Sequence, residues 1–98
     1  MENKRKLFDM LRDENYEGNI TLRSASGAPQ VFRKVAYIPY GNSEYVILQA
    51  IGMANVPEEE GLVFLLEEVG GRESINMITD TETIDAVFDI YELLVKGL

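Results

Sequence analysis

VPEEEGLVFLLEEVGG, residues 56–71, is the stretch that decides the fold class of this chain. Five consecutive apolar residues, Leu62 to Leu66, stand between two groups of carboxylates. A strand with one face in water alternates apolar and polar residues, whereas a strand that is covered on both faces is apolar throughout. The stretch therefore predicts a strand from Leu62 to about Val69, inside a sheet that needs a cover on each face.

The carboxylates of this stretch allow two interpretations, a metal or substrate site and the solvated rim of a buried strand. Glu58, Glu59 and Glu60 are consecutive, whereas a calcium loop takes its ligands from alternating positions and has a glycine at its sharp turn. Glu67 and Glu68 point to opposite faces if they continue the strand. Charges beside an apolar strand also protect it from aggregation. We interpret the acids as a rim, and we expect no metal site and no cofactor.

Short extended segments separated by turn residues lie on both sides of this strand. Before it, ITL and QVFRKVAYI flank the turn SASGAP, and EYVILQAIG follows the turn YGNS. After it, GGRE leads to a short fifth segment, residues 74–78. Pro39 ends the second segment or places it at a sheet edge. Because the connections are short, residues 18–79 predict an antiparallel meander of about five strands.

The first 17 residues predict a helical extension. Leu7, Phe8 and Leu11 fall on one face of a helix that runs from about residue 3 to residue 15. Gly18 then breaks the helix. This helix offers a narrow apolar face that can cover part of the sheet.

Residues 80–98 predict a second, amphipathic helix. A capping box of Thr79 and Glu82 starts it, with Thr81 as a competing cap. Apolar residues recur at a spacing of three then four, which makes one stripe along a helix; they are Ile84, Val87, Phe88, Tyr91, Leu94 and Val95. The fold class that results is α+β, a single domain of residues 1–98 in which the C-terminal helix packs on one face of the sheet.

Charge and composition exclude several classes of partner. The chain has 98 residues and a net charge of −8, and residues 41–98 hold twelve acids but only two bases. Such a surface repels a phosphate backbone, so we expect no nucleic acid as partner. Cysteine is absent, and no segment resembles a signal peptide or approaches the roughly 20 apolar residues that cross a bilayer. We expect a soluble cytoplasmic protein that does not bind membranes.

Catalytic residue types are scarce. Histidine and cysteine are both absent, which removes the commonest general base and all thiol nucleophiles. We therefore predict that the chain is not an enzyme. The alternative is a carboxylate-based ligand-binding protein or enzyme, and it requires a deep pocket lined by three or more of six residues. These residues are Tyr37, Tyr45, Glu58, Glu60, Glu67 and Asp80.

The acids of the second helix, Glu82, Asp85, Asp89 and Glu92, form a stripe on the side away from the apolar stripe. A stripe of this kind is usually the solvated face of the helix. A surface for a basic partner is the alternative. If the stripe continued into the loop 58–60, the chain would imitate nucleic acid toward that partner.

The C-terminal helix can cover only one face of the sheet. Left bare, the other face would expose an apolar patch that is large for a monomer. We expect the N-terminal helix to cover part of it and a homodimer to cover the rest. The function predicted is a protein-interaction or regulatory module, and its predicted interaction surface consists of Leu7, Phe8, Leu11, Val63, Leu65, Glu82, Asp85, Asp89 and Glu92.

The segment from Ile20 to Leu94 resembles the YrzB-like family of small acidic bacterial proteins, a domain of unknown function. ITL before a turn, FRKVAYIPYGNSEYVILQ, GLVFLLEEV and ITDTETIDAVFDIYELL carry the resemblance, in the family's order. The resemblance implies a cytoplasmic protein without assigned activity, cofactor or site residues. The chain departs from the family in its added N-terminal helix, in a less acidic loop at 52–61, and in SASG at the first turn.

Overall fold

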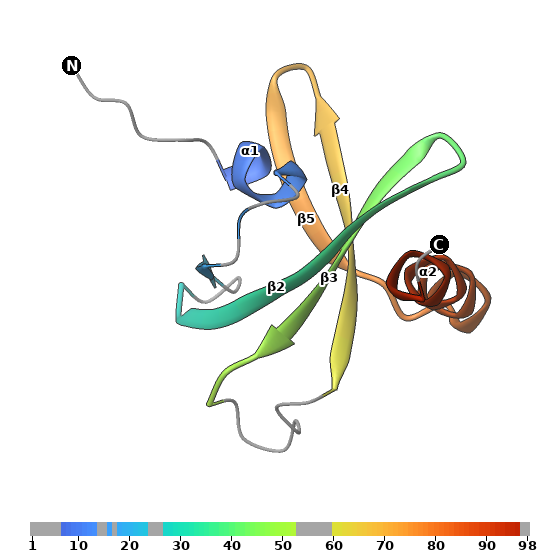
Figure 1. The fold of residues 1–98 in the computed structure, drawn as a ribbon. Helices are drawn as coiled ribbons and strands as arrows, with labels where there is room; N and C mark the ends of the chain where they lie inside the picture. The colour runs from blue at the N-terminus through green and yellow to red at the C-terminus, as the bar shows by residue number, and fades with distance from the viewer. Residues whose placement is uncertain (1–6, 14–15, 17, 24–26, 53–59, 97–98) are drawn as a thin grey trace.

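The computed structural model describes residues 7–13, 16, 18–23, 27–52 and 60–96. A five-stranded sheet lies between two helices, α1 on one side and α2 on the other (Figure 1). The predicted α+β fold class is confirmed. The elements, in chain order, are α1 Leu7–Arg12, β1 Asn19–Arg23, β2 Pro29–Tyr40, β3 Ser43–Ala50, β4 Gly61–Val69, β5 Arg72–Met77 and α2 Thr81–Val95.

The sheet is the predicted antiparallel meander, in the order β1-β2-β3-β4-β5. Two-residue turns join β2 to β3 and β4 to β5. Gly70 and Gly71 have φ values of 61° and 83°, as a tight hairpin turn with two left-handed residues requires. Gly41 has a φ of 62° in the other turn. The glycines that marked the turns in the sequence therefore have a conformational reason.

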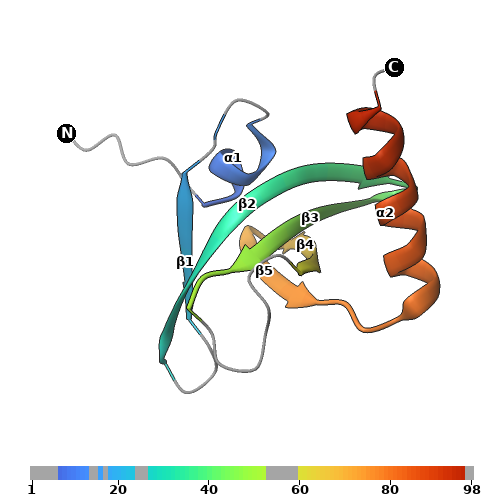
Figure 2. The same cartoon turned by 60° about the horizontal axis from the view of Figure 1, so that its bottom comes forward.

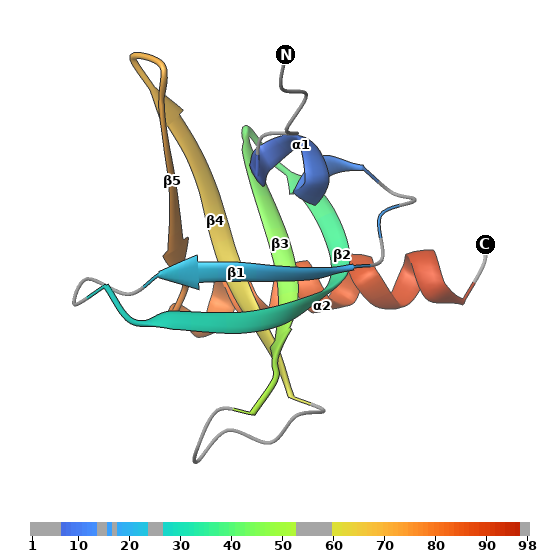
Figure 3. The ribbon, with the colours of Figure 1, turned by 90° about the vertical axis from the view of Figure 1, so that its left-hand side faces the viewer.

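A β-bulge bends β2 and curls the sheet. The register moves by one residue between Lys34 and Ala36, so Val35 has no partner on β3. Bulges bend a strand and increase its twist. The first part of β2, together with β1, consequently runs at a steep angle to β3 and β4 (Figure 3). Pro39 lies beyond the reach of β1, where β2 pairs only with β3, in keeping with the edge position expected for proline.

Each face of the sheet carries its own apolar core. On one face, Phe64 and Leu66 of β4 pack with Phe8 and Leu11 of α1. On the other face, Val63 packs with residues of α2. Alternation along a strand separates the two sets, so the apolar run of β4 is buried from both sides, as its composition predicted.

The α1 face has a cover from the sheet itself in addition to α1. The sequence suggested a short helix supplemented by a second copy of the chain. In the structure, the curl brings Ile20 of β1 and Phe32 of β2 into the same core as Phe8, and the Phe32 and Phe64 rings meet edge to face at 5.6 Å. Phe64 and Leu66 are thus buried within one chain, and the homodimer stays a prediction.

The predicted caps of α2 are wrong. Asp80 is the N-cap, and its Oδ2 accepts hydrogen bonds from the Thr83 N–H at 3.1 Å and the Thr83 hydroxyl at 2.6 Å. These bonds lower the pKa of Asp80, first through the hydroxyl and then through the backbone. Thr79 and Thr81 flank the cap. The carboxylate suits this position because the helix dipole favours negative charge there.

α1 is shorter than predicted. It ends at Arg12, whereas the sequence suggested residue 15. The predicted residues before Leu7 lie outside the described part of the chain. The early end has a local reason, since the Asp13 and Tyr16 N–H groups donate to Met10 and Asp13 carbonyls three residues back and form turns in place of a continued helix.

Candidate functional site

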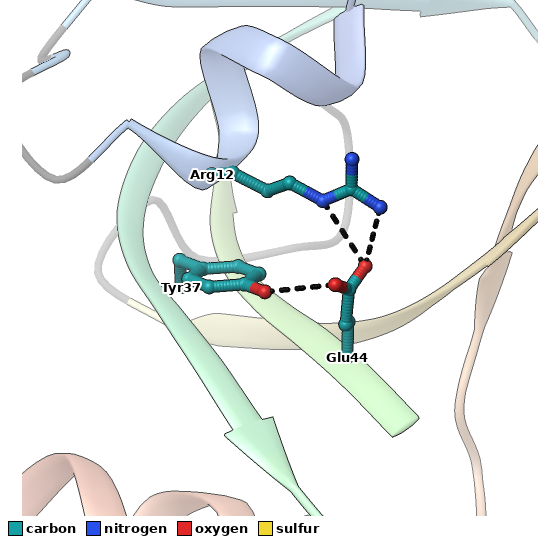
Figure 4. Close-up of polar contacts among 3 residues, drawn as sticks. All are labelled: Arg12, Tyr37 and Glu44. Atoms are coloured by element: carbon teal, nitrogen blue, oxygen red, sulfur yellow. Dashed lines mark hydrogen bonds and ion pairs between the residues drawn. The ribbon is translucent and has the colours of Figure 1, made fainter. Parts of the chain in front are cut away.

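Three polar side chains from three elements meet where α1 joins the sheet (Figure 4). Arg12 of α1 donates to Oε1 of Glu44 on β3 through Nε at 3.1 Å and through Nη2 at 2.7 Å. The Tyr37 hydroxyl of β2 donates to the other carboxylate oxygen at 3.0 Å. Both oxygens of Glu44 therefore already accept hydrogen bonds from the chain itself.

The electrostatics of this cluster favour its ionised form. The hydrogen bonds from Arg12, assisted by that from Tyr37, lower the pKa of Glu44, while burial opposes them. Burial, and then the bond to Glu44, raise the pKa of Tyr37. Arg12 is held as a cation, since its bond to Glu44 raises its pKa. A low-pKa carboxylate with both oxygens occupied is a weak general base, so the cluster reads as a clamp rather than a catalytic centre.

Lys34 adds a second polar tie between α1 and the sheet. Its side chain is buried on the α1 face, and its ammonium donates to the backbone carbonyl of Asp13, just past the end of the helix. A cation at the C-terminal end of a helix is favoured by the dipole. Together with Arg12, this contact fixes the orientation in which α1 covers the core.

A shallow cavity of about 370 Å³ lies beside the clamp. Of the six residues that the ligand-binding alternative would bring together, it contains Glu67 alone. Glu58 lies outside the described residues. The lining residues are Arg12, Asn42, Ser43, Glu44, Leu65, Leu66, Glu67, Glu68 and Val69. This cavity is therefore not the convergent site that the alternative requires.

The described residues contain neither a cluster of metal ligands nor a membrane-spanning helix. Within the described ranges, no group of three or more histidine, cysteine, aspartate or glutamate side chains is placed to hold a metal ion. Glu58 and Glu59 of the acidic loop fall outside these ranges, so a continuation of the α2 acids into that loop is not described. No helix among the described residues has the length and apolarity to cross a membrane.

The predicted interaction residues do not form one surface. Phe8, Leu11 and Val63 are at most 2% exposed, so they form the two cores and are not surface residues in this conformation. Leu65 is half-buried on β4, and the side chain of Leu7 is outside the described part. The four acids of α2 are all exposed, as expected for a solvated flank; they are Glu82, Asp85, Asp89 and Glu92.

The most exposed apolar residues of α2 include two, Leu94 and Val95, that the sequence placed on the packing stripe; that placement is wrong, because both are more than half exposed. Leu93, Leu94 and Val95, here called the apolar end of α2, are 66%, 53% and 62% exposed. The apolar stripe of α2 is buried at Val87, but the last turn of the helix extends past the β2–β3 hairpin (Figures 2 and 3). Three consecutive apolar residues were the available signal, because at 100° per residue they point to three sides and cannot share one packing face.

The comparisons with known proteins add no family. The scan against protein-family models finds no match, and the searches of curated proteins and of solved structures also find none. The resemblance of residues 20–94 to the YrzB-like family stays a prediction from sequence pattern.

Proposed function

We propose that this chain is a small, non-enzymatic protein-interaction module of the cytoplasm, and that it binds a partner protein through the apolar end of α2. The exposure of Leu93, Leu94 and Val95 carries the proposal. A helix turn that is apolar on most sides is typically buried, whereas this one projects into solvent. An accessory or regulatory role fits such a module.

The size of the apolar end supports binding. Three aliphatic side chains, each more than half exposed, leave apolar area on the order of 300 Å² in water around the last turn of α2. Other exposed apolar residues, such as Val69 and Met77, lie singly near strand ends. Single exposed apolar residues are normal on protein surfaces and need no partner.

The structural role of the polar cluster supports the apolar end of α2 as the binding site. Arg12, Tyr37 and Glu44 satisfy one another and hold α1 in place. A ligand at this site would have to replace those bonds, and the polar atoms it separated would lose stabilising partners. The apolar end of α2 has no comparable internal role, since its side chains remain largely in water.

Capture from a lysate of the native host tests the function. Leu93→Gln with Leu94→Gln removes two of the three exposed apolar side chains and leaves the buried Val87 unchanged, and Val69→Gln changes an even more exposed apolar residue elsewhere. Quantitative mass spectrometry should show proteins captured by the wild type and by Val69→Gln that the double variant loses. Equal capture by all three chains, each with an unchanged circular dichroism spectrum, would contradict the proposal.

A further inference from the structure

We propose that the apolar end of α2 docks a basic amphipathic segment of another protein, in which apolar residues are flanked by lysine or arginine. This inference rests on the proposed function and adds the chemistry of the partner. The apolar end supplies the contact area, and the charges around it decide which segments fit.

One flank of α2 is acidic along its whole length. Glu82, Asp85, Asp89 and Glu92 recur at spacings of three and four, which aligns them on one side of the helix. All four are exposed, and within the described residues none of these carboxylates forms an ion pair with a base of the chain. Among the described residues the flank is thus a row of unpaired negative charges, and it leads to the apolar end.

The end of the helix adds to the same field. Its last turn contains no basic residue, and the C-cap is Lys96, whose N–H donates to the Glu92 carbonyl at 2.9 Å. From residue 81 to residue 96 the four acids outweigh this one lysine, which leaves a charge of −3. The carbonyls that end a helix also carry partial negative charge. A basic side chain of the partner beside the apolar end would be attracted both by the acidic side chains and by the carbonyls that end the helix.

Charge also favours a basic segment over a second copy of this chain as the partner that binds the apolar end. Each copy carries a net charge of −8. Two copies that met through Leu93 and Leu94 would bring two acidic flanks together, and like charges at an interface oppose association. A segment with an apolar centre and basic edges would bury the leucines and neutralise Asp89 and Glu92. Helices of this kind commonly dock by their apolar face.

Designed peptides test the inference on the full chain without knowledge of the natural partner. The first is a helical peptide with a leucine stripe flanked by lysines. The second replaces its lysines with glutamates, and the third keeps the lysines but scatters the leucines. Fluorescence anisotropy would report the Kd of each peptide at low and at high salt. We expect only the first peptide to bind, with an affinity that falls as salt rises.

Variants assign that affinity to the two parts of the surface. Leu93→Gln with Leu94→Gln should weaken binding by about tenfold or more, as expected for central apolar contacts. Asp89→Asn with Glu92→Gln should weaken it several-fold at low salt and little at high salt. Glu67→Gln with Glu73→Gln removes two exposed acids on β4 and β5 and should change the Kd only slightly.

The outcomes distinguish this inference from the function on which it rests. Equal binding of the lysine and glutamate peptides, weakened by Leu93→Gln with Leu94→Gln, would overturn the basic partner and leave an interaction site. Binding that the leucine substitutions do not affect would contradict the site itself. A wild-type dimer by sedimentation that Leu93→Gln with Leu94→Gln converts to a monomer would assign the surface to a second copy and also overturn the inference.

Discussion

Replacing Phe8 with alanine tests whether α1 is part of the folded core or only an extension resting on it. The Phe8 side chain is 1% exposed and belongs to the core that contains Phe32 and Phe64. Phe→Ala changes in well-packed cores cost about 3 to 5 kcal/mol of unfolding free energy. The Arg12 guanidinium also lies 5.3 Å from the centre of the Phe8 ring, and this contact would be lost.

The expected loss is large for a chain of this size. Small domains unfold with a free energy of about 5 to 15 kcal/mol, so a loss of about 3 to 5 kcal/mol in Phe8→Ala should remove roughly a fifth or more of the total. Urea unfolding followed by circular dichroism measures it, with tyrosine fluorescence as a second probe because the chain has five tyrosines and no tryptophan. Val69→Ala, at a residue 77% exposed, should change the free energy by less than about 0.5 kcal/mol.

A loss below about 1 kcal/mol for Phe8→Ala would refute the reasoning, because a loosely seated helix would lose little when its anchor is cut. The sheet would then have to hold the α1 face closed by its curl alone. Coincident transitions from the two probes are needed to read either result as a single unfolding free energy.

The remaining predictions concern the clamp, a turn and the assembly state. The folded state lowers the pKa of Glu44, so the stability that Glu44 contributes is present above its unfolded-state pKa and is lost as pH falls through its folded-state pKa. Glu44→Gln should flatten that part of the profile of stability against pH. The effect should be at most about 1 kcal/mol, since the side chains of Arg12 and Glu44 are both about a third exposed. Gly71→Ala should cost about 1 kcal/mol in urea unfolding because φ is 83° there, although nothing within 4 Å would meet the added carbon; an unchanged midpoint would contradict the strain. Light scattering coupled to gel filtration should show a monomer, since one chain covers both faces of β4, and a dimer that persists at low micromolar concentration would support the homodimer predicted from the sequence.

Local patterns allowed most of the secondary structure to be predicted. The unbroken apolar run Leu62 to Leu66 indicated a strand buried on both faces, and its neighbours prove to belong to opposite cores. Glycines at 70 and 71 marked a hairpin turn because only a residue without Cβ adopts positive φ freely. These features depend on a few adjacent residues, which is why periodicity and turn chemistry suffice to find them.

The curl of the sheet and the polar clamp could not be read in the same way. The bulge at Val35 lies in FRKVAYIP, where the residues alternate poorly and give no sign of a change of face. Lys34, just before the bulge in the chain, lies on the α1 face. Ala36, just after it, lies on the α2 face and pairs with Ile47. Arg12 and Glu44 are 32 residues apart, and their pairing depends on where the fold places α1 against β3. Such contacts follow from tertiary geometry and leave no local pattern.

The candidate surface was predicted only in part. The acidic flank of α2 follows from residue spacing, and its exposure is as expected. The apolar end was assigned to the packing stripe, because Leu94 and Val95 continue the spacing of Val87 and Tyr91. Where the sheet ends beneath the helix depends on the length and bend of β2 and β3, and helix periodicity contains no information about that. Helix periodicity alone therefore could not show that the end of α2 is exposed.

Photo-cross-linking in living cells of the native host tests the central claim most directly. A photoreactive phenylalanine analogue would replace Leu93 in one chain and Val69, which is as exposed, in another. The account predicts a discrete cross-linked adduct from position 93 that Leu94→Gln in the same chain abolishes, and none from position 69. No adduct from position 93, or the same adducts from both positions, would contradict the claim that the apolar end of α2 is where this protein meets its partner.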